Sequence, residues 1–234
     1  MFLHNLAWIS IGVAVFCAIV IMVDEIRRPQ SMRVMNVVWP ATALYFSVFA
    51  LWGYFALGRA KPKGAMQQPG MHHGGGDGDD APKPPTASQV AVGTSHCGAG
   101  CMLADLGTEF AIAGSGLVLF GSMLWTDYLL DFLAAWALGI VFQYFAIKPM
   151  RQDLSGGQAV WAAVKADTLS ILAFQVGMYL WMALVHFKFF PAPHHLTPFN
   201  PVYWLMMQVG MILGYGTSFP MNRWLIGKGW KEAM

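Results

Sequence analysis

Long runs of apolar residues are the feature that most restricts how this chain can fold. A helix needs about 20 mostly apolar residues to cross a bilayer. The composition agrees, with 56% hydrophobic and 11% charged residues, whereas soluble domains carry roughly 25% charged residues. We therefore predict an all-α, polytopic membrane helix bundle with about six transmembrane helices, at residues 3–23, 36–58, 101–125, 127–148, 168–190 and 202–220.

Composition divides the chain into three parts. Residues 1–58 hold the first two predicted transmembrane helices. Residues 59–94 form a linker rich in Gly, Pro and His, which we expect to be disordered because it cannot bury a core. Residues 95–234 hold a cysteine motif at a helix start, four more transmembrane helices and a basic tail.

The distribution of Lys and Arg predicts an orientation, because cytoplasmic loops carry an excess of these residues. With six spans, one side of the membrane carries Arg27, Arg28, Arg33 and Lys188. The other side carries Arg59, Lys61, Lys63, Lys83, Lys148, Arg151, Lys165, Arg223, Lys228 and Lys231. The larger group predicts that both termini and the 59–94 linker are cytoplasmic, although Arg27 and Arg28 then face outward against the rule.

The stretch SHCGAGCMLADLGTE, residues 95–109, holds the side chains best suited to chemistry: His96, Cys97, Cys101, Asp105 and Glu109. In a helix, Cys97, Cys101 and Asp105 share one face. Thiolate and imidazole ligands select copper(I), zinc or iron–sulfur, so the stretch predicts a soft-metal site at the bundle mouth. Two other interpretations stay open: a redox pair of Cys97 and Cys101, and a structural helix start with cysteine packed as a small hydrophobe.

Two further patterns contain potential metal ligands. MHHGGGDGDD, residues 71–80, can bind copper, nickel or zinc loosely, or is simply a solvated linker. Met178, Met182 and His186 follow each other at steps of four, and so do Met207 and Met211. Thioethers suit copper(I), so these residues predict a methionine-lined interior, although methionine also fills gaps in ordinary apolar bundles.

Acids form the last candidate group. Asp127 and Asp131 share a face of the predicted fourth helix, which also carries Gln143, and Lys165 and Asp167 precede the fifth. A proton or cation path uses such buried polar residues. Capping of helices at the membrane interface uses the same residue types, and the sequence does not decide between the two.

Several blocks of the sequence resemble a known family. They are residues 36–59 (NVVWPATALYFSVFALWGYFALGR), SHCGAGC with Asp105, 139–150 (GIVFQYFAIKPM), 165–179 (KADTLSILAFQVGMY) and 203–226 (YWLMMQVGMILGYGTSFPMNRWLI). In these blocks the chain is similar to the bacterial integral membrane proteins that share domain of unknown function 4396. The resemblance implies a multi-pass protein of the bacterial inner (plasma) membrane and implies no activity. It places the family motif on His96, Cys97, Gly98, Cys101 and Asp105.

We expect this protein to bind or transport a soft metal ion, copper(I) or zinc. In this hypothesis His96, Cys97 and Cys101 capture the ion, and Asp105 and Glu109 tune the site or relay charge. The methionines and His186 then line the interior. The alternatives are a membrane thiol–disulfide or sulfur-handling protein that uses Cys97 and Cys101, and a non-enzymatic accessory or assembly subunit.

The expected partners are the lipid bilayer, a metal ion and either a second copy or another membrane protein. A net charge of +2 is too small for a nucleic-acid surface. The sequence has no phosphate-binding loop and no nucleophile elbow. Whether the protein is an enzyme stays open at this point.

Overall fold

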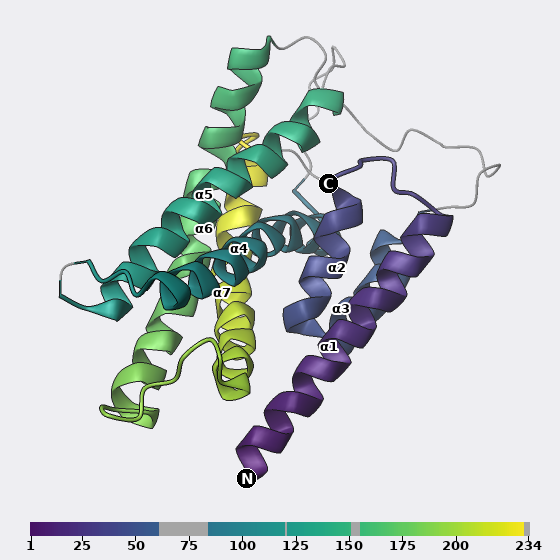
Figure 1. Cartoon of the computed structure of the whole chain (residues 1–234). Coiled ribbons are helices and arrows are strands. Elements are labelled where there is room, and N and C mark those ends of the chain that lie inside the picture. The colour runs from purple at the N-terminus through teal and green to yellow at the C-terminus, as the bar shows by residue number, and fades with distance from the viewer. Residues whose placement is uncertain (61–83, 120, 151–154, 232–234) are drawn as a thin grey trace, which may run out of the picture.

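The computed structural model describes residues 1–60, 84–119, 121–150 and 155–231. In these ranges the helices are α1 (Phe2–Arg27), α2 (Met35–Phe46), α3 (Val48–Gly53), α4 (Ala87–Ser115), α5 (Met123–Met150), α6 (Gly156–Leu184) and α7 (Pro201–Gly227). The π-helical turns Tyr54–Gly58 and Val185–Phe189 extend α3 and α6. The described residues form helices and no strands, which confirms the all-α prediction (Figure 1).

Among the described residues, three helices are long and apolar enough to cross a membrane: Phe2–Arg27, Met123–Ile147 and Gly156–Phe189. They indicate a membrane protein. The prediction of about six spans is therefore confirmed only for its membrane character and its helical class.

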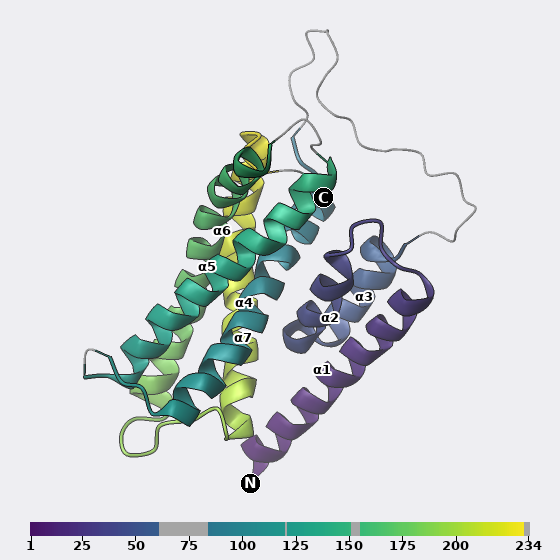
Figure 2. The ribbon, with the colours of Figure 1, turned by 45° about the horizontal axis from the view of Figure 1, so that its top comes forward.

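Helices α4 to α7 form a bundle in which α4 and α5, α5 and α6, and α6 and α7 are antiparallel neighbours (Figure 2). Small residues let these helices approach closely. A Cβ built on Gly177 of α6 would meet the backbone of Leu213 and Gly214 of α7, and a Cβ on Gly214 would meet the carbonyl oxygen of Phe174. Such small-residue contacts are typical of membrane helices, where packing takes the place of the hydrophobic driving force.

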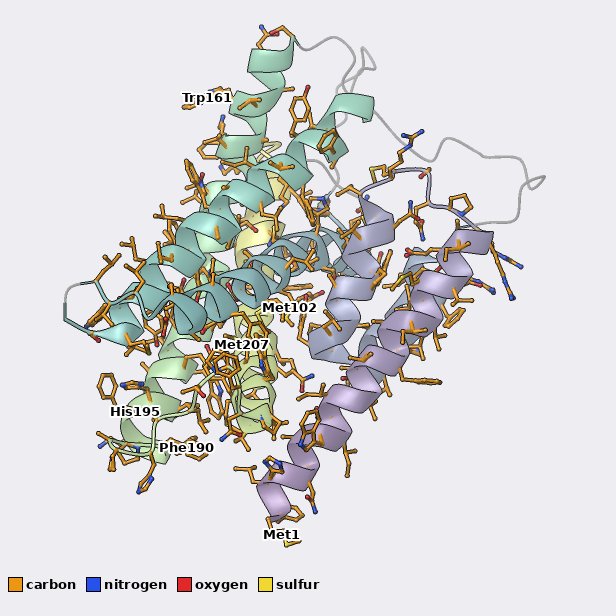
Figure 3. All side chains as sticks on the ribbon, viewed as in Figure 1. Met1, Met102, Trp161, Phe190, His195 and Met207 are labelled. Carbon is orange, nitrogen blue, oxygen red and sulfur yellow. The ribbon has the colours of Figure 1, made fainter. Side chains whose placement is uncertain are left out.

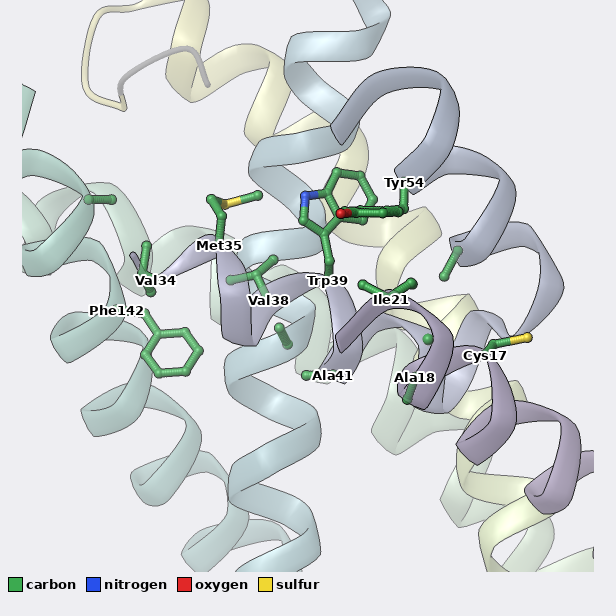
Figure 4. Close-up of a cluster of buried hydrophobic side chains, with 14 residues drawn as sticks. Cys17, Ala18, Ile21, Val34, Met35, Val38, Trp39, Ala41, Tyr54 and Phe142 are labelled. Carbon is green, nitrogen blue, oxygen red and sulfur yellow. The ribbon is translucent and has the colours of Figure 1, made fainter. Parts of the chain in front are cut away.

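The predicted second span, residues 36–58, is wrong. Ser47 has a positive φ of 49° and separates α2 from α3, and the chain folds back there. In one straight helix, Trp39 and Tyr54 would lie about 22 Å apart at 1.5 Å per residue. Their rings lie 5.7 Å apart instead (Figure 4). Together α2 and α3 form a helical hairpin whose two ends lie together, since Gln30 Nε2 donates to the carbonyl oxygen of Gly58 at 2.8 Å.

This hairpin is held by a buried apolar cluster, which explains why its composition resembles that of a span. Ile21 of α1, Val38 and Trp39 of α2, and Ala99 of α4 all belong to the cluster and are at most 4% exposed (Figure 4). The residues are apolar because they pack between α1 and α4. Composition alone does not distinguish that position from a full membrane crossing.

The two ends of the chain lie at opposite ends of the bundle (Figure 1). Near the start of each helix, Ser10 of α1 donates to the Gln208 side chain of α7 at 2.6 Å, so α1 and α7 begin together. We call this the Met1 end. The opposite Lys231 end holds the end of α7 and the beginning of α4, where a Cβ on Gly93 would lie 3.8 Å from Ile226. The expectation that both termini are cytoplasmic stays a prediction.

Several predicted boundaries also change. The 59–94 linker is too long, because α4 already begins at Ala87 with a capping box between Thr86 and Gln89; residues 61–83, including the His-rich 71–80 stretch, lie outside the described residues. Helix α4 ends before Gly116, whose φ is 66°, so the connection to α5 is not the tight turn expected at Thr126. Helix α7 continues past Pro220 to Gly227 and includes part of the predicted tail.

Candidate functional site

One buried face of α4 carries most of the residues that the sequence singled out. Cys97, Cys101 and Asp105 are 0% exposed and Glu109 is 4% exposed, so the predicted helical face is confirmed. Glycines let neighbouring helices reach this region. A Cβ on Gly98 would clash with the hydroxyl of Tyr45, so only glycine fits there without a shift. The chain thus places thiol and carboxyl groups in the bundle interior rather than at its mouth.

At the Lys231 end, the interior of the bundle holds a charged cluster. Lys231 Nζ donates to Cys97 Sγ at 2.7 Å and to Asp167 Oδ1 at 3.0 Å, and lies 3.5 Å from Ser170 Oγ. The side chains of Lys231 and Asp167 are fully buried. We call Lys231, Cys97, Asp167 and Ser170 the Lys231 cluster.

Helix α7 contacts this cluster through Ser170. Ser170 Oγ donates to Asn222 Oδ1 at 2.9 Å, and Asn222 Nδ2 donates to Ser218 Oγ at 2.8 Å. Burial alone would lower the pKa of Lys231, but Asp167 and Cys97 hold that pKa above its ordinary value. The charge of Lys231 is thus balanced within the bundle by Asp167.

His96 does not join Cys97 in one site. Consecutive helical residues point in directions about 100° apart, and the His96 ring packs edge-on against Phe142, with ring centroids 5.8 Å apart. His96 is 0% exposed, and neither of its ring nitrogens has a hydrogen-bond partner in the described part of the chain. The predicted three-residue capture site of His96, Cys97 and Cys101 is therefore not assembled.

The geometry of Cys97 and Cys101 does not favour a disulfide. Both are free and buried. Residues four apart on a helix have Cβ atoms about 5–6 Å apart, whereas a disulfide needs roughly 3.5–4.5 Å. A redox pair would require α4 to unwind locally.

In the bundle interior, polar side chains from α4, α5 and α6 are buried without partners among the described residues. Neither carboxyl oxygen of Asp105 has a hydrogen-bond partner among the described residues, and the same holds for the side-chain amides of Gln143 and Gln175. All three residues are at most 1% exposed. Buried polar groups are normally paired, so each such group requires an explanation, for example an ordered water or an ion.

At the Met1 end, α4, α5, α6 and α7 enclose a pocket. It combines carboxyl groups, thioethers and an imidazole, from Glu109, Asp127, Asp131, Met178, Met182, His186 and Met207. We call it the Met–acid pocket. Its cavity of about 50 Å³ has room for a few waters or an ion and is far below the roughly 300–1,000 Å³ of a site for an organic ligand. Of the predicted site residues, this pocket brings together Glu109, Met178, Met182, His186 and Met207.

Met211 packs beside these residues without reaching the cavity. It is fully buried in the same apolar cluster as Met178 and Met207. Packing alone accounts for Met211, in the gap-filling role that methionine has in apolar bundles.

Aromatic and histidine rings hold the walls of this pocket. Tyr128 and Tyr179 stack 4.1 Å apart, and each hydroxyl donates to the other residue's backbone carbonyl. The His186 ring stacks on His195 at 3.9 Å. Figure 3 shows His195 and Phe190 at this end of the bundle and Met207 deeper inside.

Sequence reasoning missed two of these residues. His195 lies in the loop between α6 and α7, where the His194–His195 pair was a usable signal. Lys231 lies 134 residues from Cys97, and no local pattern could join them. In the residues that the structure describes, no group of three or more His, Cys, Asp or Glu side chains is placed to hold a metal ion.

Comparison with known proteins adds a family but no activity. Residues 86–231 match the family described as domain of unknown function (DUF4396). The match begins at the residue that caps α4 and ends at Lys231, so it contains the Lys231 cluster and the Met–acid pocket, whereas the 36–59 block lies outside it. No curated protein and no solved structure matches the chain. Because the match covers more than half of its residues, the protein belongs to the DUF4396 family.

Proposed function

We propose that this protein binds a soft metal ion, copper(I) in the first place, in the Met–acid pocket and carries it through the membrane. The observation that carries the proposal is the convergence of Met178, Met182, Met207 and His186 on one small cavity. Thioether and imidazole are the neutral ligands that copper(I) accepts, while harder cations prefer oxygen. Zinc is the second choice, since it would rely on His186 and the carboxylates.

Charge also supports a cation as the ligand. Glu109, Asp127 and Asp131 line the pocket, and no Lys or Arg is among its described lining residues. Carboxyl groups held in a bundle interior are unfavourable unless a cation or a proton partners them. The pocket therefore attracts a positive ion and repels anions.

We further propose that the Lys231 end faces the cytoplasm of a bacterial inner membrane. Among the described residues, Lys188 is the one Lys or Arg near the Met1 end; the other end carries Arg27, Arg28, Arg33, Arg59, Lys165, Arg223, Lys228 and Lys231. The α2–α3 hairpin resolves the conflict over Arg27 and Arg28, because both lie on the cytoplasmic side when residues 36–58 do not cross. The Met–acid pocket then belongs to the outer half of the bundle.

The test is an anaerobic copper(I) titration of the detergent-purified chain against a chromogenic chelator. We expect Met178→Leu/Met182→Leu to weaken binding by about tenfold or more, the scale on which even outer ligand partners act. Leucine conserves the packing volume, and Met206→Leu on α7 is the matched control, because Met206 adjoins Met207 without lining the pocket. Equal affinity in the wild type and the double variant would reject the pocket as the site.

Transport is tested separately, in liposomes that contain the protein and an internal copper(I) indicator. We expect copper to enter at a rate above that of empty liposomes and to slow in Met178→Leu/Met182→Leu. Binding without entry would leave a metal-binding protein and remove the transport part of the proposal.

A further inference from the structure

The Lys231 cluster has the form of a cation site filled by the chain itself. A lysine ammonium has three donors and no acceptor. Here these donors face a sulfur, a carboxylate oxygen and a hydroxyl oxygen, at 2.7, 3.0 and 3.5 Å. Cys97 Sγ also lies 3.3 Å from Asp167 Oδ1, so the thiol and the carboxylate border the same position.

The ammonium leaves ligand capacity unused around this position. Asp167 Oδ2 is buried and has no hydrogen-bond partner among the described residues. An unpaired buried polar group is destabilising. This oxygen therefore indicates an occupant of the site other than the ammonium.

The lysine sits on a short segment that can be withdrawn without unfolding a helix. Helix α7 ends at Gly227, and Gly229, with a φ of 67°, turns the chain back toward the bundle. Backbone donors of Trp230 and Lys231 both use the carbonyl oxygen of Leu225. Trp230 covers the segment from outside, is 40% exposed and lies against Lys165, whose Nζ is 4.1 Å from the ring centroid.

From this arrangement we infer that Lys231 occupies the seat of a soft cation, and that copper(I) displaces it to bind the Cys97 thiolate. The inference rests on the proposed function, because it makes this cluster the cytoplasmic entry site for the ion held in the Met–acid pocket. When copper(I) binds, the Cys97 thiol passes its proton to Asp167 Oδ1, 3.3 Å away, because only the thiolate is a ligand. The ammonium leaves with the segment after Gly227, so the net charge of the site stays close to constant.

The primary test uses the unaltered chain. Purified protein is treated with acetic anhydride with and without copper(I), supplied anaerobically as its acetonitrile complex, and lysine acetylation is read by peptide mass spectrometry. We expect Lys231 to be protected without copper and to become acetylated several-fold faster with it. Exposed Lys228 is the internal control and should not change. Protection of Lys231 that persists at saturating copper would overturn the inference.

A second variant separates this inference from the proposed function. In Met178→Leu/Met182→Leu the pocket is impaired while the Lys231 cluster is intact, so copper(I) should still expose Lys231. If the response disappears there, the lysine follows the pocket and does not compete for copper, and the inference is rejected. If the response persists although neither chain binds copper in the pocket, only the proposed function fails.

Cys97→Ser completes the design from the ligand side. It removes the sulfur and keeps a hydroxyl, so the response of Lys231 to copper(I) should vanish. Cys17→Ser is the control, because Cys17 of α1 belongs to the buried apolar cluster that holds the α2–α3 hairpin and not to the Lys231 cluster. A Lys231 response that survives Cys97→Ser would show that Cys97 is not the ligand and would overturn the inference.

Discussion

The Lys231 cluster and the Met–acid pocket share one face of α4 and solve the same problem in opposite ways. Cys97 and Glu109 are twelve residues apart, about 18 Å along the helix. At the Lys231 end the carboxylate of Asp167 meets the ammonium of Lys231, and the interior is filled. At the Met1 end three carboxyl groups surround a cavity, and no Lys or Arg is among the described residues that line it.

This difference shows which buried charges a fold neutralises for itself and which it leaves to a ligand. A buried charge without a partner is strongly unfavourable, so the acids of the pocket need a proton or a cation from outside. The Lys231 cluster needs nothing from outside to be stable. We therefore interpret the filled cluster as a gated site and the open pocket as a receptive one.

The largest expected effect concerns whether the two sites face opposite sides of the membrane. Exposed positions replaced one at a time, Arg33→Cys, Thr197→Cys and Lys228→Cys, are labelled with a membrane-impermeant maleimide in cells and in inverted vesicles. We expect Arg33→Cys and Lys228→Cys to react from the cytoplasmic side only, and Thr197→Cys from the outside only. Six full spans would instead place Arg33 and Lys228 on opposite sides, and that result would exclude the hairpin topology.

Next in size is the loss of the buried ion pair. Lys231→Met leaves Asp167 buried without its cation, and breaking a buried pair costs about 3–5 kcal/mol. We expect unfolding in detergent–SDS mixtures to show this loss in the free energy of unfolding. The double variant Lys231→Met/Asp167→Asn should recover most of it, because no uncompensated charge remains, while Lys228→Met should be neutral. A double variant as unstable as the single one would show that packing, and not charge, holds the cluster.

A smaller effect is expected at the α6–α7 seam, the close contact between these two helices at Gly177 and Gly214, which supports both sites. Gly214→Ala adds a Cβ that meets the Phe174 backbone, and overpacking of this kind costs about 1–3 kcal/mol. Gly216→Ala, two residues further on, meets open space and should be neutral or slightly stabilising, since alanine favours the helix. Both are measured by the same unfolding assay. Equal effects at the two glycines would mean that the seam is not tightly packed.

The smallest effect belongs to the exposed ion pair at the Lys231 end. Arg59 Nη2 contacts Asp24 Oδ1 at 2.7 Å, with side chains 36% and 15% exposed, and the hydrogen bond to Asp24 raises the pKa of Arg59. Water screens such a pair, so Arg59→Met should lower the free energy of unfolding far less than Lys231→Met does. A loss as large as that of Lys231→Met would remove the contrast between the buried and the exposed pair.

Much of the candidate site followed from local pattern. The step of four residues placed Cys97, Cys101 and Asp105 on one buried face, and the same step placed Met178, Met182 and His186 along α6 and the turn that extends it. Helical periodicity is set by the backbone, so these relations hold wherever the helix packs. Arg27 and Arg28 also fit the proposed orientation once residues 36–58 fold back at Ser47.

By itself, the sequence determined the membrane setting, the helical class and the polar face of α4, because apolar length and periodicity are properties of neighbouring residues. Only the tertiary structure decided that residues 36–58 fold back, that His96 turns away from Cys97, and that Lys231 reaches Cys97 and Asp167. It also decided which acids and methionines enclose one cavity. These outcomes depend on contacts between segments far apart in the chain. Such a contact does not change the spacing of residues within either segment, so the sequence pattern does not reveal it.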